Sequence, residues 1–296
     1  MSTSLFIGLG RMGRPMVGHI AQRFDTAVYD IVPEVTKDVA QEIGATPHYD
    51  LAHLEGIDTV ILMAPTSAIV ESILIDSGVL DGLSTGSLII DMGSSVPAST
   101  QKLAALAAAR GIDYVDAPVS GGIAKAATGE LAMLVGGEPS AIERAMPFIE
   151  AVGADVVVVG GSGAGHAAKA INNLVSASNQ AIVAEALIRG KAAGIEPERM
   201  VAVLNSSTGM SQASQVKFPN HVLTGTYASK FSYDLMLKDM GIAMGIDAPA
   251  ASTPLTQASY ELLVRARETL GEAPDHTEIT RGYERLFHTT IVKEEA

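Results

Sequence analysis

The sequence contains no cysteine and no tryptophan, and aromatic residues make up only 4% of its 296 residues. Without cysteine the chain has no disulfide, no thiolate nucleophile and no cysteine-ligated metal. Its seven histidines are scattered and show no HxxxH or HxH spacing, so a histidine metal site is not expected. The sequence excludes thiol chemistry and argues against a metal centre.

Basic residues are also scarce: 20 Lys and Arg stand against 33 Asp and Glu, which gives a net charge of -13. This charge repels a phosphate backbone, so nucleic acid is not an expected partner. No apolar run is long enough to span a bilayer, and the strand-like residues that begin at Ser4 leave no room for a signal peptide. We expect a cytoplasmic protein that is long enough for two domains.

Short apolar runs alternate with helix-like segments from residue 4 to about residue 160. Strands alternating with helices indicate an α/β unit with a mainly parallel sheet covered on both faces. The predicted strands are residues 4–7, 27–30, 59–63, 87–91, 113–116, 131–135 and 156–159.

A glycine-rich segment at residues 160–163 ends this alternation, and the pattern after it is helical. The predicted domains are therefore 1–162 and an all-helical 163–296, joined by a long helix from Ala164 to Ala193. A helix of this length measures about 45 Å, and we expect it to form the spine of the second domain and part of a homodimer or homotetramer interface. Further helices are predicted near residues 196–204, 212–218, 231–245, 254–270 and 275–287.

The first strand leads into a GxGxxG turn that opens a helix, which is the context of a dinucleotide-binding loop. In such a loop the first glycine permits the tight turn, the second lets the backbone approach a pyrophosphate, and the third allows close packing of helix on strand. A plain glycine-rich turn is the alternative. The residues are Gly8, Leu9, Gly10, Arg11, Met12 and Gly13.

Asp30 ends the second predicted strand, seventeen residues after Gly13. An acidic side chain at this point accepts hydrogen bonds from the adenosine ribose hydroxyls and repels a 2′-phosphate. Since Ile31 rather than arginine follows, NAD is preferred over NADP. The alternative role for Asp30 is to cap the next helix.

Two polar segments are not required by the fold. In Asp116–Gly122 (DAPVSGG), the Ser120 hydroxyl and the amides of Gly121 and Gly122 are suited to holding a carboxylate, although an ordinary loop is as consistent with the pattern.

The second segment is Gly163–Asn173 (GAGHAAKAINN). On a helix, Lys169 shares a face with Asn172 and Asn173, among small and apolar residues. Desolvation lowers a lysine pKa toward the range that a general base needs, and the two amides are suited to binding the hydroxyl and carboxylate of a substrate. A solvated surface face is the alternative. Because the segment lies at the predicted junction of the domains, we favour a catalytic role for Lys169.

Lys238 and Asp239 lie in the helix predicted after Phe231. A surface ion pair and a role in the substrate cleft are equally consistent with this pattern.

Four segments in this order resemble the β-hydroxyacid dehydrogenase family, which includes 3-hydroxyisobutyrate dehydrogenase and tartronate semialdehyde reductase. The segments are GLGRMGRPM (residues 8–16), DAPVSGG (116–122), GAGHAAKAINN (163–173) and LKDM (237–240).

The resemblance implies that NAD-dependent oxidation of a small β-hydroxyacid uses Lys169 as the acid/base. It implies that Ser120, Gly121, Gly122 and Asn173 hold the substrate, and that Lys238 borders the nicotinamide. It further implies that Met63 and Pro65 lie along the cofactor and that Ser94, in a DMGS turn similar to the family's DMST, contacts the cofactor ribose.

The chain departs from the family pattern at Lys125, where relatives commonly have glycine, and has no tryptophan after Gly209. Lys125 resembles the threonate (tetronate) dehydrogenase branch and suits a larger or more polar substrate, or it faces solvent. The alternatives are therefore a threonate-type sugar-acid dehydrogenase, an NAD(P)H-dependent semialdehyde reductase, and a non-catalytic dinucleotide sensor on the same scaffold.

Overall fold

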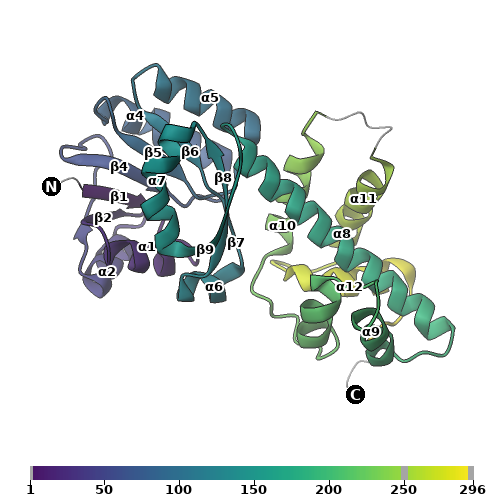
Figure 1. Cartoon of the computed structure of the whole chain (residues 1–296). Coiled ribbons are helices and arrows are strands. Elements are labelled where there is room, and N and C mark those ends of the chain that lie inside the picture. Colours follow the sequence, from purple (N-terminus) through teal and green to yellow (C-terminus); the bar gives the residue numbers. More distant parts are fainter. Residues whose placement is uncertain (1–2, 248–252, 293–296) are drawn as a thin grey trace. The chain divides into compact units, whose positions relative to one another are not determined.

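The computed structural model describes residues 3–247 and 253–292 (Figure 1). The chain divides into two compact units, Met1–Lys169 and Ala170–Ala296. The boundary expected from the sequence, at residue 162, lies shortly before this division.

A single sheet forms the centre of the first unit, with strand order β3-β2-β1-β4-β5-β6-β8-β7 and with β9 also paired to β8. All neighbouring pairs are parallel except β6–β8 and β7–β8, so the predicted mainly parallel sheet is confirmed. The strands are β1 (Thr3–Ile7), β2 (Thr26–Tyr29), β3 (Thr46–Pro47), β4 (Ile57–Leu62), β5 (Leu88–Asp91), β6 (Asp113–Asp116), β7 (Val119–Ser120), β8 (Leu131–Gly137) and β9 (Gly153–Gly160).

Two hydrophobic clusters cover the two faces of this sheet because successive strand residues point to opposite sides. Phe6 packs with α1, α2 and α7, whereas Leu5 and Ile7 pack with α3, η1, α4 and α5. Prolines at the first turn favour the starts of α2, α5 and α7. The helices are α1 (Gly13–Ala21), α2 (Pro33–Ile43), α3 (Ser67–Glu71), π-helical η1 (Ser72–Asp76), α4 (Val79–Gly82), α5 (Pro97–Ala108), α6 (Gly122–Thr128) and α7 (Pro139–Val152).

The second unit is helical, as predicted, and α8 runs as one helix from the end of the first unit into it. Its core includes the fully buried rings of Tyr233, Tyr283 and Phe218. Apart from an isolated bridge between Ser232 and Asp275, its described residues form no β-pairing. The elements are α8 (Ala164–Ala192), α9 (Pro197–Asn205), π-helical η2 (Ala213–Val222), α10 (Tyr233–Met244), α11 (Pro254–Glu268), 3-10 helical η4 (His276–Glu278) and α12 (Ile279–Phe287).

The segment predicted as one helix over residues 275–287 is divided between η4 and α12. Asp275 precedes η4 and forms a capping box. Its carboxylate accepts a hydrogen bond from the Thr277 N–H, and the Glu278 carboxylate accepts one from the Asp275 N–H. Among the helices of residues 3–247 and 253–292, none is long and apolar enough to cross a membrane.

Candidate active site

The glycine-rich turn between β1 and α1 leaves open space at its centre. A Cβ on Gly8, which has φ +100°, would lie 2.5 Å from the Met63 carbonyl oxygen, and one on Gly13 would lie 1.8 Å from the Gly8 carbonyl oxygen. Gly10, by contrast, is exposed, and a Cβ there would meet nothing within 4 Å. The outer glycines are required by the protein's own packing, while the middle one leaves its backbone accessible to a ligand.

Other residues of this turn divide between core and solvent. Leu9 is buried at 2% exposure and Met12 packs against the core cluster of α1, whereas Arg11 is exposed beside Gly10. The turn therefore presents backbone and one cation outward, a combination that suits a pyrophosphate.

Asp30 is fixed at the carboxyl end of β2 by two backbone donors. Its Oδ2 accepts the Leu9 N–H at 2.9 Å and its Oδ1 accepts the Val32 N–H at 3.0 Å. Each carboxylate oxygen keeps a second lone pair that is able to accept a ribose hydroxyl. Ile31 is 86% exposed and provides no cation for a 2′-phosphate. The residues of this turn and strand end fit NAD.

Met63, Pro65 and Ser94 follow the carboxyl ends of β4 and β5, at the same sheet edge as the glycine-rich turn. The Met63 N–H donates to the Ile7 carbonyl at 2.9 Å. A Cβ on Gly93 would lie 2.4 Å from the Ala64 carbonyl oxygen, so the two segments pass in direct contact. The structure thus brings these three residues to the edge where β1 and β2 present the glycines and Asp30.

The Ser120–Gly122 segment joins a two-residue strand, β7, to α6. Ser120 pairs with Ala132 of β8, while Gly121 and Gly122 have φ values of +136° and +74°. These angles lie in the region that favours glycine, and both glycines are exposed. A strand of two residues carries no periodicity, so β7 could not be predicted from the sequence.

The start of α8, which carries Lys169, is anchored by a buried carboxylate from β6. Asp116 is 0% exposed; its Oδ1 accepts the Gly163 N–H at 2.8 Å and its Oδ2 accepts the His166 N–H at 3.0 Å. A Cβ on Gly165 would lie 2.4 Å from the Leu134 carbonyl oxygen, so the helix also touches β8. Asp116 therefore satisfies helix N–H groups that would otherwise have no acceptor. Lys169 itself is half-buried.

His166 belongs to a buried polar cluster beneath this helix start. Its Nδ1 lies 2.7 Å from Thr100 Oγ1, and its Nε2 lies 3.7 Å from Oδ2 of Asp91. The Tyr114 hydroxyl donates to that same oxygen at 3.1 Å, and burial together with Asp91 raises the pKa of Tyr114 well above its usual value. Sequence reasoning assigned no role to this cluster, whose members come from four separate segments.

In the second unit, Asp239 links two of the expected site residues. Asn173 is 8% exposed and donates its Nδ2 to Asp239 Oδ2 at 2.6 Å, while Lys238 Nζ lies 3.1 Å from Asp239 Oδ1. Asn172 is exposed and donates to Asn173 Oδ1 at 3.2 Å. Asp239 is only 3% exposed, so the surface interpretation of this acidic residue is wrong.

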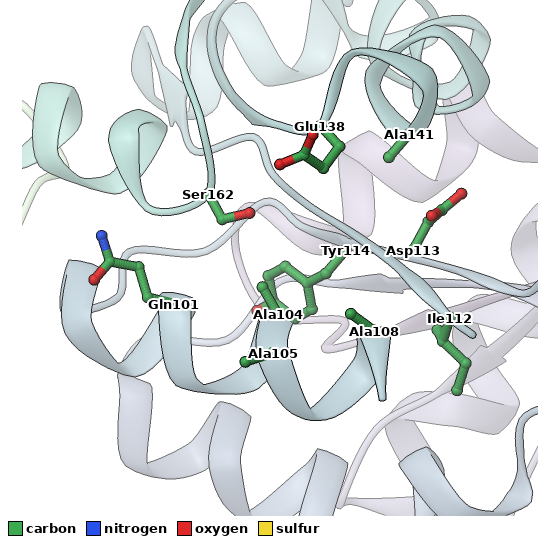
Figure 2. A pocket seen from close by; sticks show the side chains of 10 residues that line it. All are labelled: Gln101, Ala104, Ala105, Ala108, Ile112, Asp113, Tyr114, Glu138, Ala141 and Ser162. Atoms are coloured by element: carbon green, nitrogen blue, oxygen red, sulfur yellow. The ribbon is translucent and has the colours of Figure 1, made fainter. Parts of the chain in front are cut away.

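A separate cleft of 270 Å³ lies over β6 between α5 and the start of α7 (Figure 2). None of the expected site residues lines it, and its ionisable lining groups are acidic, including Asp113 and Glu138. None of its lining residues is basic, so the cleft offers no cation to an anionic hydroxyacid or a dinucleotide. The lining consists of Gln101, Ala104, Ala105, Ala108, Ile112, Asp113, Tyr114, Glu138, Ala141 and Ser162.

Comparison with known proteins identifies the family to which the chain belongs. Residues 4–161 match the family described as the NAD binding domain of 6-phosphogluconate dehydrogenase, and residues 163–283 match the family described as NAD-binding of NADP-dependent 3-hydroxyisobutyrate dehydrogenase. The chain is 35% identical to 3-sulfolactaldehyde reductase of Escherichia coli, over 90% of this chain and 91% of that protein. The chain belongs to the β-hydroxyacid dehydrogenase family.

Two further relatives of this β-hydroxyacid dehydrogenase are informative. It is 38% identical to 2-(hydroxymethyl)glutarate dehydrogenase of Eubacterium barkeri over 81% of this chain and 80% of that one. Its fold matches that of Mycobacterium tuberculosis 3-hydroxyisobutyrate dehydrogenase with L-serine, with a TM-score of 0.86, 28% identity, and coverage of 96% and 99%. The protein is an NAD-dependent dehydrogenase that acts on the hydroxyl of a small hydroxyacid, and the alternative functions are not favoured.

Proposed function

We propose that the substrate is a β-hydroxyacid of the 3-hydroxyisobutyrate type and that Lys169 is the general acid/base. The anchoring of the α8 start by Asp116 is the observation that carries this proposal, because it fixes the helix turn from which Lys169 extends. A general base must be held within hydrogen-bond reach of the proton that it removes. Lys169 lies on the anchored first turns of α8 and not on a loop.

The proposed cofactor contacts follow the sheet edge described above. The glycine-rich turn would hold the pyrophosphate and Asp30 the adenosine ribose, since the Asp30 carboxylate is already oriented by the turn itself. The full proposed set is Gly8, Leu9, Gly10, Arg11, Met12, Gly13, Asp30, Met63, Pro65, Ser94 and Lys238.

For the substrate, we assign the carboxylate to Ser120, Gly121 and Gly122, whose hydroxyl and exposed amides suit an anion. Asn173 is assigned to the substrate hydroxyl, with Asp239 orienting the amide so that its oxygen and nitrogen are not interchangeable. Asn172 and Lys238 complete the proposed contacts.

Bound NAD supplies the hydride acceptor. Lys169 takes the proton of the substrate hydroxyl while the carbinol carbon is oxidised to an aldehyde or ketone. Asn173 and the Ser120–Gly122 segment hold the substrate in the aligned position that such a transfer requires. The activities of the relatives, among them 3-hydroxyisobutyrate dehydrogenase and NAD-dependent L-serine dehydrogenase, support a small β-hydroxyacid.

The test compares NADH production by wild type, Lys169→Ala and Lys169→Arg on 3-hydroxyisobutyrate, serine and glycerate. We expect kcat to fall at least 100-fold in Lys169→Ala, since general acid/base catalysis contributes about 10²–10⁴-fold. The NAD dissociation constant, measured by calorimetry, should stay within about twofold. Equal kcat in wild type and Lys169→Ala would overturn the role of Lys169.

We further propose a cytoplasmic homodimer or homotetramer. Location in the cytoplasm is consistent with dependence on NAD. Within the second unit, Ile171, Val175 and Ile182 are 46%, 52% and 59% exposed and share one face of α8, which suits packing against α8 of a second copy. Ile182→Glu should lower the sedimentation-derived mass if this face forms the interface, and an unchanged mass would contradict it.

A further inference from the structure

Lys125 lies directly against the segment assigned to the substrate carboxylate. It sits in α6, four residues after Gly121, and helical side chains lean toward the N-terminus and cover the preceding turn. Its Cδ, Cβ and Cγ lie 2.7, 2.9 and 3.2 Å from the position that a Cβ on Gly121 would occupy. The aliphatic part of the lysine is folded over the loop, and the ammonium is only two bonds beyond Cδ.

This packing requires the glycine at position 121. Any side chain there would collide with the lysine stem and would also meet an unfavourable φ of +136°. Gly121 and Lys125 therefore form one structural feature, in which the aliphatic stem of a lysine packs against the glycine of the loop.

No acidic side chain of residues 3–247 and 253–292 pairs with the Lys125 ammonium. Although the chain carries 33 acidic residues, no carboxylate among the residues that the structure describes lies within salt-bridge distance of Lys125, and the side chain is exposed. Lys102, also exposed and in the same unit, is by contrast paired with Glu71 at 2.6 Å. A protein with a net charge of -13 disfavours approach of a dianion unless a cation is placed locally.

We propose that Lys125 is a specificity-determining residue that binds a second negatively charged group of the substrate, away from the reacting hydroxyl. This inference rests on the proposed function, since it assumes that Ser120, Gly121 and Gly122 hold the first carboxylate. A hydroxyl and two backbone amides suffice for one carboxylate, so the adjacent ammonium is available to another. The favoured substrate class is a β-hydroxyacid with a second anionic group, such as a carboxylate or sulfonate.

A matched pair of substrates tests this assignment. 2-(Hydroxymethyl)succinate differs from 3-hydroxyisobutyrate only in carrying a carboxylate on the methyl group. Lys125→Met keeps the length of the side chain but removes its charge. An exposed ion pair of this kind corresponds to about a fivefold effect, so Lys125→Met should lower kcat/KM for the diacid about fivefold, through KM, while changing the monoacid less than about 1.5-fold.

Two control variants separate a local effect of Lys125 from the effect of a changed net charge of the protein. Lys125→Arg should retain most of the diacid activity, and Lys37→Met, which removes an exposed lysine from α2, should leave the ratio of the two kcat/KM values unchanged. Raising the KCl concentration should reduce the diacid kcat/KM of wild type more than that of Lys125→Met, because salt screens an exposed pair.

Equal losses for both substrates would assign Lys125 to the first carboxylate, and no loss for either would remove it from substrate binding; both results overturn the proposal. Turnover of neither compound by wild type would contradict the proposed function instead. In that case, calorimetry with the non-reacting pair methylsuccinate and isobutyrate still tests Lys125, since only methylsuccinate should bind more weakly to Lys125→Met. Equal binding of methylsuccinate to both proteins would refute the assignment.

Discussion

Replacing Asp116 by asparagine tests whether the start of α8 depends on a single carboxylate. The two oxygens of Asp116 accept the N–H groups of Gly163 and His166 at 2.8 and 3.0 Å, and the side chain is fully buried. Asparagine has the same shape but offers only one acceptor. Its amide nitrogen must face one of the two backbone donors, so that a donor meets a donor in a site closed to water.

The magnitude follows from these contacts. A hydrogen bond to a charged acceptor contributes about 1.5–3 kcal/mol, and a buried donor left without an acceptor costs about 1–3 kcal/mol. Both ranges describe the same N–H group, so they are not added. Because a donor faces a donor in a buried site, the upper end of both ranges applies, and Asp116→Asn should destabilise the helix start by about 3 kcal/mol. Since about 1.4 kcal/mol corresponds to a factor of ten, local opening of this segment becomes about 100-fold more frequent.

Hydrogen–deuterium exchange over residues 161–168 measures this opening without requiring two-state unfolding of a two-unit chain. Asp113→Asn is the matched control, because Asp113 lies in the same strand but forms a partly exposed ion pair with Arg144 that contributes under about 1 kcal/mol. We expect about 100-fold faster exchange in Asp116→Asn and no change in Asp113→Asn. Exchange at wild-type rates in Asp116→Asn would show that the carboxylate does not hold the helix.

Further expectations concern the glycine-rich turn and a buried histidine. Gly13→Ala places a Cβ 1.8 Å from the Gly8 carbonyl oxygen, so the free energy of unfolding in urea should fall by more than about 3 kcal/mol; a loss under 1 kcal/mol would contradict the rigidity of this contact. Asp30→Ala should raise the dissociation constant of NAD about tenfold in calorimetry and reduce the ratio of the NADP and NAD dissociation constants. Unchanged dissociation constants would remove Asp30 from the cofactor site. Burial lowers the pKa of His276 to about 4, so between about pH 6.5 and 4 the unfolded chain binds a proton that the folded chain does not. The free energy of unfolding therefore falls as the pH falls through this window, by up to about 3 kcal/mol. His276→Gln should remove this part of the pH dependence, measured by urea titrations at several pH values. His53→Gln, which changes a histidine at the surface, should leave it in place.

The glycine-rich turn between β1 and α1 was predictable because its requirements are local in the sequence. The close approach of Gly13 to Gly8 and the positive φ of Gly8 each demand glycine, whatever the rest of the fold. Asp30 was predictable for the same reason, since it ends a strand at a fixed distance from the turn. Its direct hydrogen bond to the Leu9 N–H was not, because that contact depends on the register of β1 against β2.

The domain boundary shows how a local signal and a tertiary contact differ. Glycines at residues 160–163 break the strand-helix alternation, so the sequence favours a boundary there. Asp116, however, binds the amides of Gly163 and His166, and this contact attaches the first turns of α8 to the sheet unit. The division after Lys169 therefore follows from a carboxylate 47 positions earlier in the chain than Gly163, which periodicity does not reveal.

The helix that carries Lys169 was predictable from the sequence, but the groups that orient the neighbours of Lys169 were not. Three residues before it, the His166 N–H is held by Asp116 of β6. Four residues after it, the Asn173 amide is held at 2.6 Å by Asp239 of α10. Both carboxylates are almost fully buried, and each is far more costly to bury than a neutral side chain unless it is hydrogen-bonded. Two buried carboxylates, one bound before Lys169 and one after it, are explained if this helix segment must be held in place at both ends. The reason is that a shift of a general base by about 1 Å slows the catalysed reaction strongly. The two aspartates are thus best understood as positioning residues, and their effect should be on kcat rather than on the affinity for NAD.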